Sequence, residues 1–172
     1  AISEKLKRVN KLDIPEEQVM MSQGVTPTMW LAVQMACRPG DEVIVTDPMY
    51  SPFLNAVNVN NARPVYWKLD LEEGYKFDIE RLKACVTPRT RLIFVCNPHN
   101  PAGRAMTKEE LKGIAEVAVD NNLCIMVDEL WEDIRYDGKK HYSLAALDEE
   151  AAALTMTSWG FSKTWSVPGF QA

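Results

Sequence analysis

Lys163 stands in surroundings that could make a lysine chemically reactive. Between positions 151 and 172 it is the only charged residue, and the stretch is rich in Trp, Phe, Ala, Thr and Ser. Partial burial among apolar side chains favours the neutral amine, and a neutral amine is a nucleophile for a carbonyl carbon. A solvent-exposed loop lysine is the alternative, but the small residues around Lys163 would let a bulky ligand approach the backbone.

Asp128 comes directly after the apolar run 123–127 and is a candidate partner for a cation. The run is typical of a buried strand, so the carboxylate starts at the strand's end with low-dielectric protein behind it. Such a carboxylate requires a cationic or N–H partner. The alternative is an aspartate that caps the next helix, and for the neighbouring Glu129 the alternative is a charge exposed to solvent.

Three further features could each bind part of one ligand. Gly24-Val25-Thr26 lies at a predicted helix N-terminus, where free backbone N–H groups and the helix dipole suit a phosphate, with a plain N-cap as the alternative. Tyr50 offers an aromatic face, unless it is a tyrosine at the edge of the core. Asn100, held between prolines, offers an amide that can donate to an anionic oxygen, although asparagine is also common in such turns.

Several catalytic and metal-binding classes lack their motifs in this sequence. G-x-S-x-G is absent and His99 is far from His141, so a Ser/His hydrolase has no support. G-x-G-x-x-G is absent too, which removes the ordinary dinucleotide fingerprint. The four cysteines lie at wide spacings without a C-x-x-C pair. This spacing argues against a metal site and a disulfide framework. Three of the four cysteines lie inside strongly apolar runs, which indicates reduced core residues of a cytosolic protein.

The overall composition argues against two kinds of partner. Lys and Arg number 19 and Asp and Glu number 24, so the formal net charge is −5, which disfavours nucleic acid. No apolar stretch reaches the roughly 18 residues that span a bilayer, so no membrane partner is expected. The length of 172 residues and the 47% hydrophobic content predict one globular domain over residues 1–172.

Strand and helix signals alternate along the chain. This order predicts an α/β fold with three α/β/α layers around a mostly parallel sheet. The predicted strands are 43–46, 64–67, 92–96, 123–127 and 152–157, and the predicted helices begin near residues 2, 26, 51, 79 and 107. In the second helix Thr26 is the expected N-cap, followed by proline, and Trp30, Val33 and Cys37 are expected to face the core.

The candidate polar residues all fall at one edge of this predicted sheet. In open α/β sheets the ligand lies outside the carboxyl ends of the strands, and the candidates reach that edge although they span most of the chain. Together they suit a phosphate, a ring nitrogen that needs a carboxylate, a phenolate that needs a donor, a flat ring, and an aldehyde that needs a lysine. One ligand with all five features is pyridoxal 5′-phosphate, which we expect as the cofactor.

Six segments, in this order and spacing, also carry a resemblance over nearly the whole chain: Ser22-Gln23-Gly24-Val25-Thr26, Pro39-Gly40-Asp41, Asp47-Pro48-Met49-Tyr50, Asn97-Pro98-His99-Asn100-Pro101-Ala102-Gly103, Val127-Asp128-Glu129 and Ser162-Lys163-Thr164. They resemble the fold-type I pyridoxal-phosphate enzymes, specifically the class I/II aminotransferases and the similar cystathionine β-lyase-like C–S lyases. The N-P-x-N-P-x-G and S-K segments, placed around D-E at a strand end, are the most specific of them.

The resemblance implies a role for each candidate residue. Lys163 would form a Schiff base (aldimine) with the cofactor and then move the proton on the substrate's α-carbon, and Asp128 would pair with the pyridinium nitrogen. Asn100 would bond the phenolic oxygen of the ring, and Tyr50 would stack on the ring. The other residues expected to bind the cofactor, with the phosphate at positions 25 and 26, are Gly24, Val25, Thr26, Trp131 and Ser162.

Three positions depart from the family's pattern. Trp131 stands where many relatives have a tyrosine that bonds the phenolic oxygen, and Gly160 stands where a serine often reaches the phosphate. Gln171 occupies the place of a frequent phosphate-binding arginine. Each departure loses a polar contact, so we expect the cofactor to be bound more weakly or by other groups.

By this resemblance the expected activity is that of a pyridoxal-phosphate-dependent aminotransferase acting on amino acids and 2-oxo acids, as a cytoplasmic homodimer. A C–S β-lyase is one alternative, and a cofactor-binding module without catalysis is the other. In the family the small domain, with the arginine that holds the substrate carboxylate, lies beyond the position of Ala172, so we expect this sequence to be the large-domain portion. Taken alone it is expected to bind the cofactor but to turn over substrate poorly or not at all. Its last segment would then favour self-association through exposed apolar side chains, namely Trp159, Phe161, Trp165, Val167 and Phe170.

Overall fold

The strands form one sheet in which every described pair is parallel. The computed structural model describes residues 1–136, 138 and 140–169. The strand order across the sheet is β2-β1-β3-β4-β5, which confirms the predicted parallel sheet. The strands are β1 (Glu42–Asp47), β2 (Arg63–Lys68), β3 (Thr90–Cys96), β4 (Cys124–Asp128) and β5 (Thr155–Ser158).

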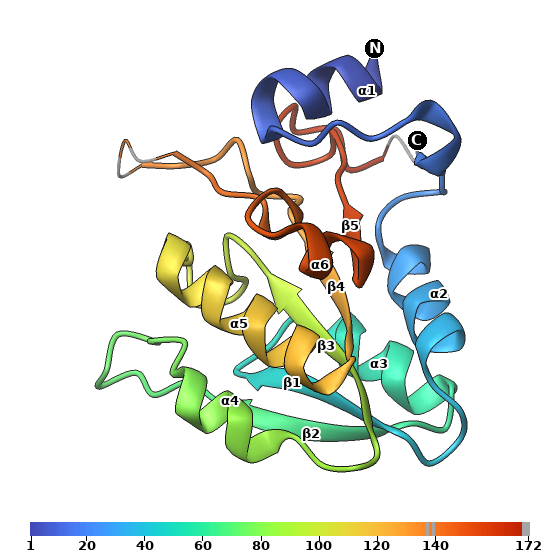
Figure 1. Cartoon of the computed structure of the whole chain (residues 1–172). Coiled ribbons are helices and arrows are strands. Elements are labelled where there is room, and N and C mark those ends of the chain that lie inside the picture. The colour runs from blue at the N-terminus through green and yellow to red at the C-terminus, as the bar shows by residue number, and fades with distance from the viewer. Residues whose placement is uncertain (137, 139, 170–172) are drawn as a thin grey trace.

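Helices cover both faces of the sheet, so the predicted three-layer α/β/α fold is confirmed (Figure 1). On one face lie α2 (Thr26–Ala36) and α3 (Ser51–Val59). On the other face lie α4 (Ile79–Cys85), α5 (Lys108–Asn121) and α6 (Glu149–Ala153). In the described part of the chain, no helix combines the length and the apolar character needed to cross a membrane. The short helical turns are α1 (Ile2–Lys5), η1 (Leu6–Asn10), η2 (Glu16–Gln18) and η3 (Leu144–Ala146).

The central strand β3 shows why this sequence needs both helical layers. Leu92 and Phe94 pack into the core under α2 and α3, whereas Ile93 and Val95 pack into the core under α4 and α5. All four side chains are at most 1% exposed. A strand buried on both faces reads as a continuous apolar run, because neighbouring side chains point to opposite faces and neither face meets water.

The chain leaves the sheet in opposite directions after β1 and after β3. From β1 it passes through α3 to β2 on one side, whereas from β3 it passes through α5 to β4 on the other. The strand order therefore reverses between these two neighbours, and the crevice at such a reversal is the usual ligand position in open α/β sheets.

Two predictions about α2 are wrong. Thr26 is the first residue of the helix, and Val25 stands at the N-cap position without a side-chain hydrogen bond. Trp30 is 43% exposed and Cys37 lies just past the helix end, only half-buried. Val33 is buried as predicted, and the other side chains of α2 that pack on the sheet are Met29 and Ala32.

The last strand is shorter than its sequence pattern indicates. It begins at Thr155 and not at residue 152, because a short helix occupies the preceding residues. Asp148 starts that helix by accepting a hydrogen bond from the backbone N–H of Ala151 at 2.8 Å. The local cap therefore overrides the apolar run that suggested a longer strand.

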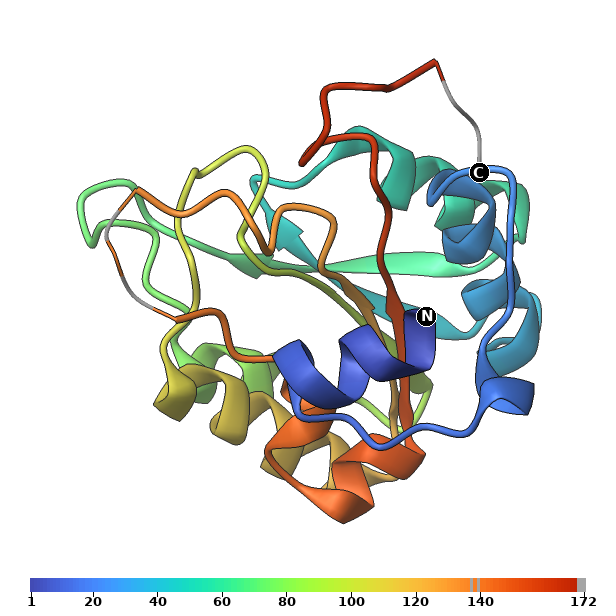
Figure 2. The same ribbon diagram turned by 90° about the horizontal axis from the view of Figure 1, so that it is seen from above.

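The N-terminal segment lies beside β5 and the chain that follows it (Figure 2). Leu6 is 1% exposed, and the Lys5 amine lies 5.9 Å from the ring centroid of Trp159. Lys5 also forms an ion pair with Glu132, which follows β4. The N-terminus is thereby tied to the two strand ends from which the candidate lysine and aspartate come.

Candidate active site

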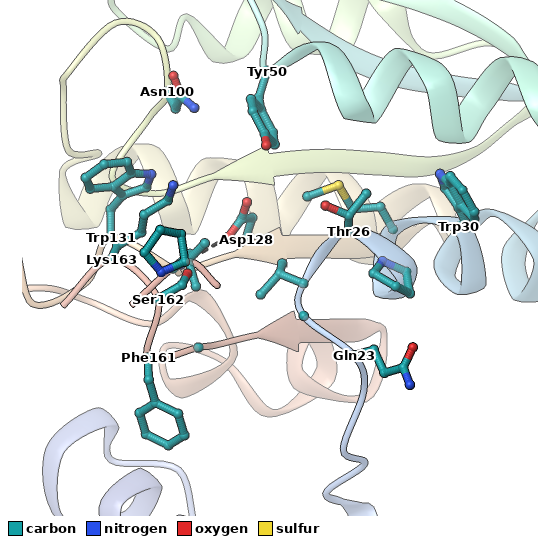
Figure 3. A pocket seen from close by; sticks show the side chains of 17 residues that line it. Gln23, Thr26, Trp30, Tyr50, Asn100, Asp128, Trp131, Phe161, Ser162 and Lys163 are labelled. Carbon is teal, nitrogen blue, oxygen red and sulfur yellow. Dashed lines mark hydrogen bonds between the residues drawn. The ribbon is translucent and has the colours of Figure 1, made fainter. Parts of the chain in front are cut away.

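A pocket of about 470 Å³ lies at the carboxyl ends of the strands. Figure 3 shows its lining side chains, which come from segments far apart in the sequence. The structure brings together in this one pocket all nine residues that the sequence indicates as cofactor-binding: Gly24, Val25, Thr26, Tyr50, Asn100, Asp128, Trp131, Ser162 and Lys163.

Lys163 lies in the loop after β5, and its side chain lies beside the ring of Trp131 in the lining of the pocket (Figure 3). Its Nζ atom is 5.1 Å from the ring centroid, within the range at which an indole face attracts a cation. The lysine is half-buried, so it is not the freely solvated loop lysine of the alternative interpretation. Trp131 thus holds the amine at one wall of the pocket.

Asp128 is the last residue of β4 and is only 4% exposed. Its Oδ1 atom accepts a hydrogen bond from the backbone N–H of Leu130 at 3.0 Å, so the carboxylate also caps the turn that follows. Burial raises the pKa of Asp128 to about 6, and the charge of Lys163 lowers it only in part. The carboxylate is therefore poorly compensated and would gain from a cationic donor placed in the pocket.

The N-terminus of α2 forms another wall of the pocket. Gly24 has φ +80°, a left-handed conformation that suits glycine, and it turns the chain into the helix. Among the described residues, none accepts a hydrogen bond from the backbone N–H groups of Val25 and Thr26. Free N–H groups at the positive end of a helix dipole are suited to an anion such as a phosphate.

Tyr50 and Asn100 follow β1 and β3, the two strands between which the sheet order reverses. Tyr50 is 36% exposed and lines the pocket, and its ring is nearly perpendicular to that of Phe53, with the centroids 6.1 Å apart. Within the described part of the chain, the side-chain amide of Asn100 makes no hydrogen bond, and it lines the pocket. Both groups can therefore be given to a ligand without breaking an internal contact.

Several pocket residues are not among the sequence-based site residues. Trp30 lies four residues after Thr26, and this spacing puts both on the same side of α2. The spacing could have indicated a pocket residue, but the helical pattern predicts that Trp30 faces the core. Phe161 lines the pocket two residues before Lys163. The remaining ones are Gln23, Pro27, Met29, Leu130, Gly160 and Pro168.

Glu129 is fully buried beside the pocket, which excludes the alternative of a charge exposed to solvent. Its carboxylate accepts hydrogen bonds from the backbone N–H of Leu144 at 3.3 Å and from the Trp159 indole at 3.1 Å. Nε2 of His141 lies 3.3 Å from Oε2 of the same carboxylate. Glu129 thus joins the end of β4 to the segment that leads toward Lys163.

The structure bears on two of the three departures from the family's pattern. A Cβ atom at Gly160 would lie 2.8 Å from Cδ1 of Leu130 and 3.4 Å from Cγ2 of Val25, so a larger residue would require Leu130 to move. Trp131 replaces a hydroxyl by an aromatic face toward Lys163. Gln171 lies outside the described residues, as does Phe170.

Asp128 is expected to reduce the stability of the cofactor-free chain at neutral pH. Its pKa is about 6 in the folded chain against an ordinary 3.8, so between these values the folded chain binds a proton that the unfolded chain has lost. The free energy of unfolding therefore falls as the pH rises from 4 to above 6, by about 3 kcal/mol. We expect the free energy of unfolding of the Asp128→Asn variant, measured in urea, to exceed that of the native chain by a comparable amount at pH 8 and to equal it at pH 4.

The matched control is Asp47→Asn, which changes an exposed aspartate at the end of β1. It is expected to change the free energy of unfolding by less than about 0.5 kcal/mol at either pH. His99, whose pKa burial lowers to about 4, loses its contribution to stability as the pH falls. That loss is common to all the chains and cancels in the comparison. Equal stability of the Asp128→Asn variant and the native chain at pH 8 would contradict a desolvated carboxylate.

Taken together, the architecture and the pocket define a doubly wound α/β protein with an amine and a carboxylate at its ligand crevice. The sequence profile of the family described as aminotransferase class I and II matches residues 1–172. The chain belongs to this family.

Individual relatives show how far the similarity extends. An aspartate aminotransferase of Bacillus sp. (strain YM-2) is 34% identical over 171 residues, which cover 99% of this chain and 44% of that protein. Cystathionine beta-lyase PatB of Bacillus subtilis (strain 168) is 34% identical over 158 residues, 91% of this chain and 41% of PatB. This chain therefore spans less than half the length of these relatives.

A solved structure with the same architecture contains the expected cofactor. It is a PLP-bound putative aminotransferase from Clostridium difficile 630, with a TM-score of 0.92 and 31% sequence identity. The match covers 99% of this chain and 44% of that one. The fold is thus shared over the whole of the present sequence.

Proposed function

We propose that this chain binds pyridoxal 5′-phosphate in the pocket at the strand ends and forms the cofactor-binding part of an amino-acid aminotransferase. The observation that carries the proposal is the convergence of the Lys163 amine, the buried Asp128 carboxylate and the N-terminus of α2 on one pocket (Figure 3). The family and the PLP-bound relative support it.

The residues of the pocket fit the ring nitrogen of the cofactor, which requires a carboxylate partner when it is protonated. A carboxylate with a pKa of about 6 is partly neutral near pH 7, and a protonated ring nitrogen beside it would supply the cationic partner that the pocket lacks. The free N–H groups of Val25 and Thr26 fit the phosphate, and the open amide of Asn100 fits the phenolic oxygen. The donor and acceptor types therefore match the group.

Bound in this pocket, the cofactor would supply an aldehyde for covalent attachment and an aromatic ring that accepts electrons from the substrate's α-carbon. Lys163 would be the point of attachment. When its amine is free, Lys163 would take the proton from the substrate's α-carbon and donate it to the cofactor rather than back to that carbon, as amino-group transfer requires. Asp128 would hold a proton at the ring nitrogen, and the Trp131 face would keep the lysine amine beside the pocket in the meantime.

The test of the proposed reaction is product analysis with the chain loaded with pyridoxal 5′-phosphate. Aspartate and 2-oxoglutarate are suitable substrates, because a relative at 34% identity is named an aspartate aminotransferase. We expect glutamate and the 2-oxo acid of the donor to form, and chromatography measures both products. Because this chain spans 44% of that relative, slow product formation is compatible with the proposal. A loaded chain that binds the cofactor but exchanges the α-proton of none of the amino acids tested would contradict the enzyme and leave the cofactor-binding module.

A C–S β-lyase is the second candidate, because PatB is 34% identical to 91% of this chain. Both reactions begin with removal of the same α-proton and differ in whether a β-thiol is expelled. Cystathionine is the discriminating substrate: pyruvate and a thiol from it would favour the lyase, whereas transfer of its amino group to 2-oxoglutarate would favour the aminotransferase.

We further propose that the protein acts as a homodimer in the cytoplasm. Support for self-association comes from Phe161 and Trp165, which are 55% and 69% exposed near the pocket. All four cysteines are free, as is usual in a reducing compartment. Sedimentation velocity at several concentrations tests the oligomeric state, and a monomer at all of them would contradict the dimer.

A further inference from the structure

His99 lies outside the lining of the pocket, and each of its two ring nitrogens has a polar partner. The residue is 2% exposed and sits directly before Asn100. Its Nε2 atom lies 2.9 Å from the hydroxyl of Thr46, and its Nδ1 atom accepts the backbone N–H of Ala102 at 3.4 Å. The proposed chemistry gives this ring no task.

The two partners of His99 determine the position of its proton. The backbone N–H of Ala102 can only donate, so Nδ1 must present a lone pair. The proton of the neutral ring is therefore on Nε2, and the ring donates to the Thr46 hydroxyl. Burial and the charge of Arg104 lower the pKa of His99 to about 4, so the ring is neutral at physiological pH and keeps this arrangement.

The hydrogen bond to Thr46 connects the two strands between which the sheet order reverses. Thr46 is in β1, four residues before Tyr50, whereas His99 belongs to the loop that follows β3 and carries Asn100. From these strands the chain departs to opposite faces of the sheet, so the loops after them share no helix layer that would hold them together.

The loop after β3 is braced on its other side by α5. The backbone N–H of His99 donates to the carbonyl of Arg104 at 2.7 Å, and Arg104 makes two hydrogen bonds of 2.9 Å to Glu110. The Phe77 ring lies 5.4 Å from the His99 ring and 5.2 Å from the Arg104 guanidinium. This side of the loop is therefore held to α5, and the contact of the His99 ring with Thr46 joins the loop to β1.

We propose that His99 is a positioning residue of the cofactor site, whose neutral ring fixes the spacing between the loop that carries Tyr50 and the loop that carries Asn100 by donating to Thr46. The inference rests on the proposed function, because these two side chains are the ones assigned to the cofactor ring. It requires the Nε2–H donor in particular and not merely a side chain that fills the space.

Two substitutions by amide side chains distinguish the role of the Nε2–H donor from the mere filling of space by the ring. His99→Gln places its amide near the position of Nε2 and can still donate to Thr46, whereas His99→Asn reaches only the position of Nδ1. Thr46→Val removes the acceptor and keeps the shape. We expect His99→Asn and Thr46→Val each to weaken the binding of pyridoxamine 5′-phosphate about tenfold, the size of one lost hydrogen bond. The double variant is expected to be no weaker than either single one, and His99→Gln to stay within about twofold of the native chain.

Hydrogen exchange on the cofactor-free chain gives a readout that does not depend on binding. In His99→Asn and in Thr46→Val, the backbone amides of residues 49–51 and of the non-proline residues in 97–103 are expected to exchange faster together, with His99→Gln unchanged. Equal effects of the glutamine and asparagine variants, additive effects of the two sites, or faster exchange confined to one loop would overturn the positioning role. If the native chain fails to bind pyridoxamine 5′-phosphate, the proposed function is wrong, and the exchange result decides the link between the loops on its own.

Discussion

Lys163→Ala is expected to abolish covalent attachment of pyridoxal 5′-phosphate to this chain. The native chain, incubated with the cofactor and reduced with borohydride, should carry one cofactor on the peptide that contains Lys163. The variant should carry none, because only an amine in the pocket can meet an aldehyde whose phosphate and ring nitrogen are held by α2 and Asp128. Mass spectrometry of the reduced, digested chain measures the result.

The matched control is Lys68→Ala, which removes another lysine at the carboxyl end of a strand, β2. Lys68 is at the sheet edge, 72% exposed and paired with Asp70, so its removal should leave the attachment unchanged. Lys163→Arg adds a second comparison, since it keeps a cation for the Trp131 face without a primary amine. Attachment that survives at full extent in Lys163→Ala would remove Lys163 from its assigned role.

Asp128→Asn should slow the exchange of the substrate's α-proton by about two to three orders of magnitude, the usual effect of removing one preorganised charged partner. Asparagine keeps the shape and still accepts the N–H of Leu130, but it cannot hold a proton at the ring nitrogen. Exchange of an amino acid in deuterated water, followed by NMR with the loaded chain, measures the loss. The same substitution is expected to raise stability, so the two readouts move in opposite directions.

This opposition distinguishes a functional carboxylate from a structural one. A carboxylate that only caps the turn at Leu130 would leave α-proton exchange unchanged when replaced by asparagine. Asp47→Asn, at the exposed end of β1, serves again as the control and should alter neither exchange nor stability. Slow exchange in both variants would indicate a general disturbance of the sheet edge and would contradict the specific role of Asp128.

The sequence by itself determined the class of fold and the edge of the sheet at which the pocket lies. Buried strands appear in the sequence as apolar runs because neither of their faces meets water. The start of α5 is recognisable from its capping box, Thr107 with Glu110. A polar residue directly after such a strand must lie at the carboxyl edge. This rule is local, so it placed Asp128, Tyr50 and Asn100 correctly, while their roles toward a cofactor stay predictions.

Only the tertiary structure decided which side chains face one another at that edge. Trp30 lines the pocket, although the helical pattern of the sequence assigned it to the core. Glu129 is buried and accepts hydrogen bonds from two other segments of the chain. The contacts of Lys163 with Trp131 and of His99 with Thr46 are of the same kind. Each joins residues far apart in the chain, so its distance depends on how both helix layers pack on the sheet, and no local pattern of residue types contains that distance.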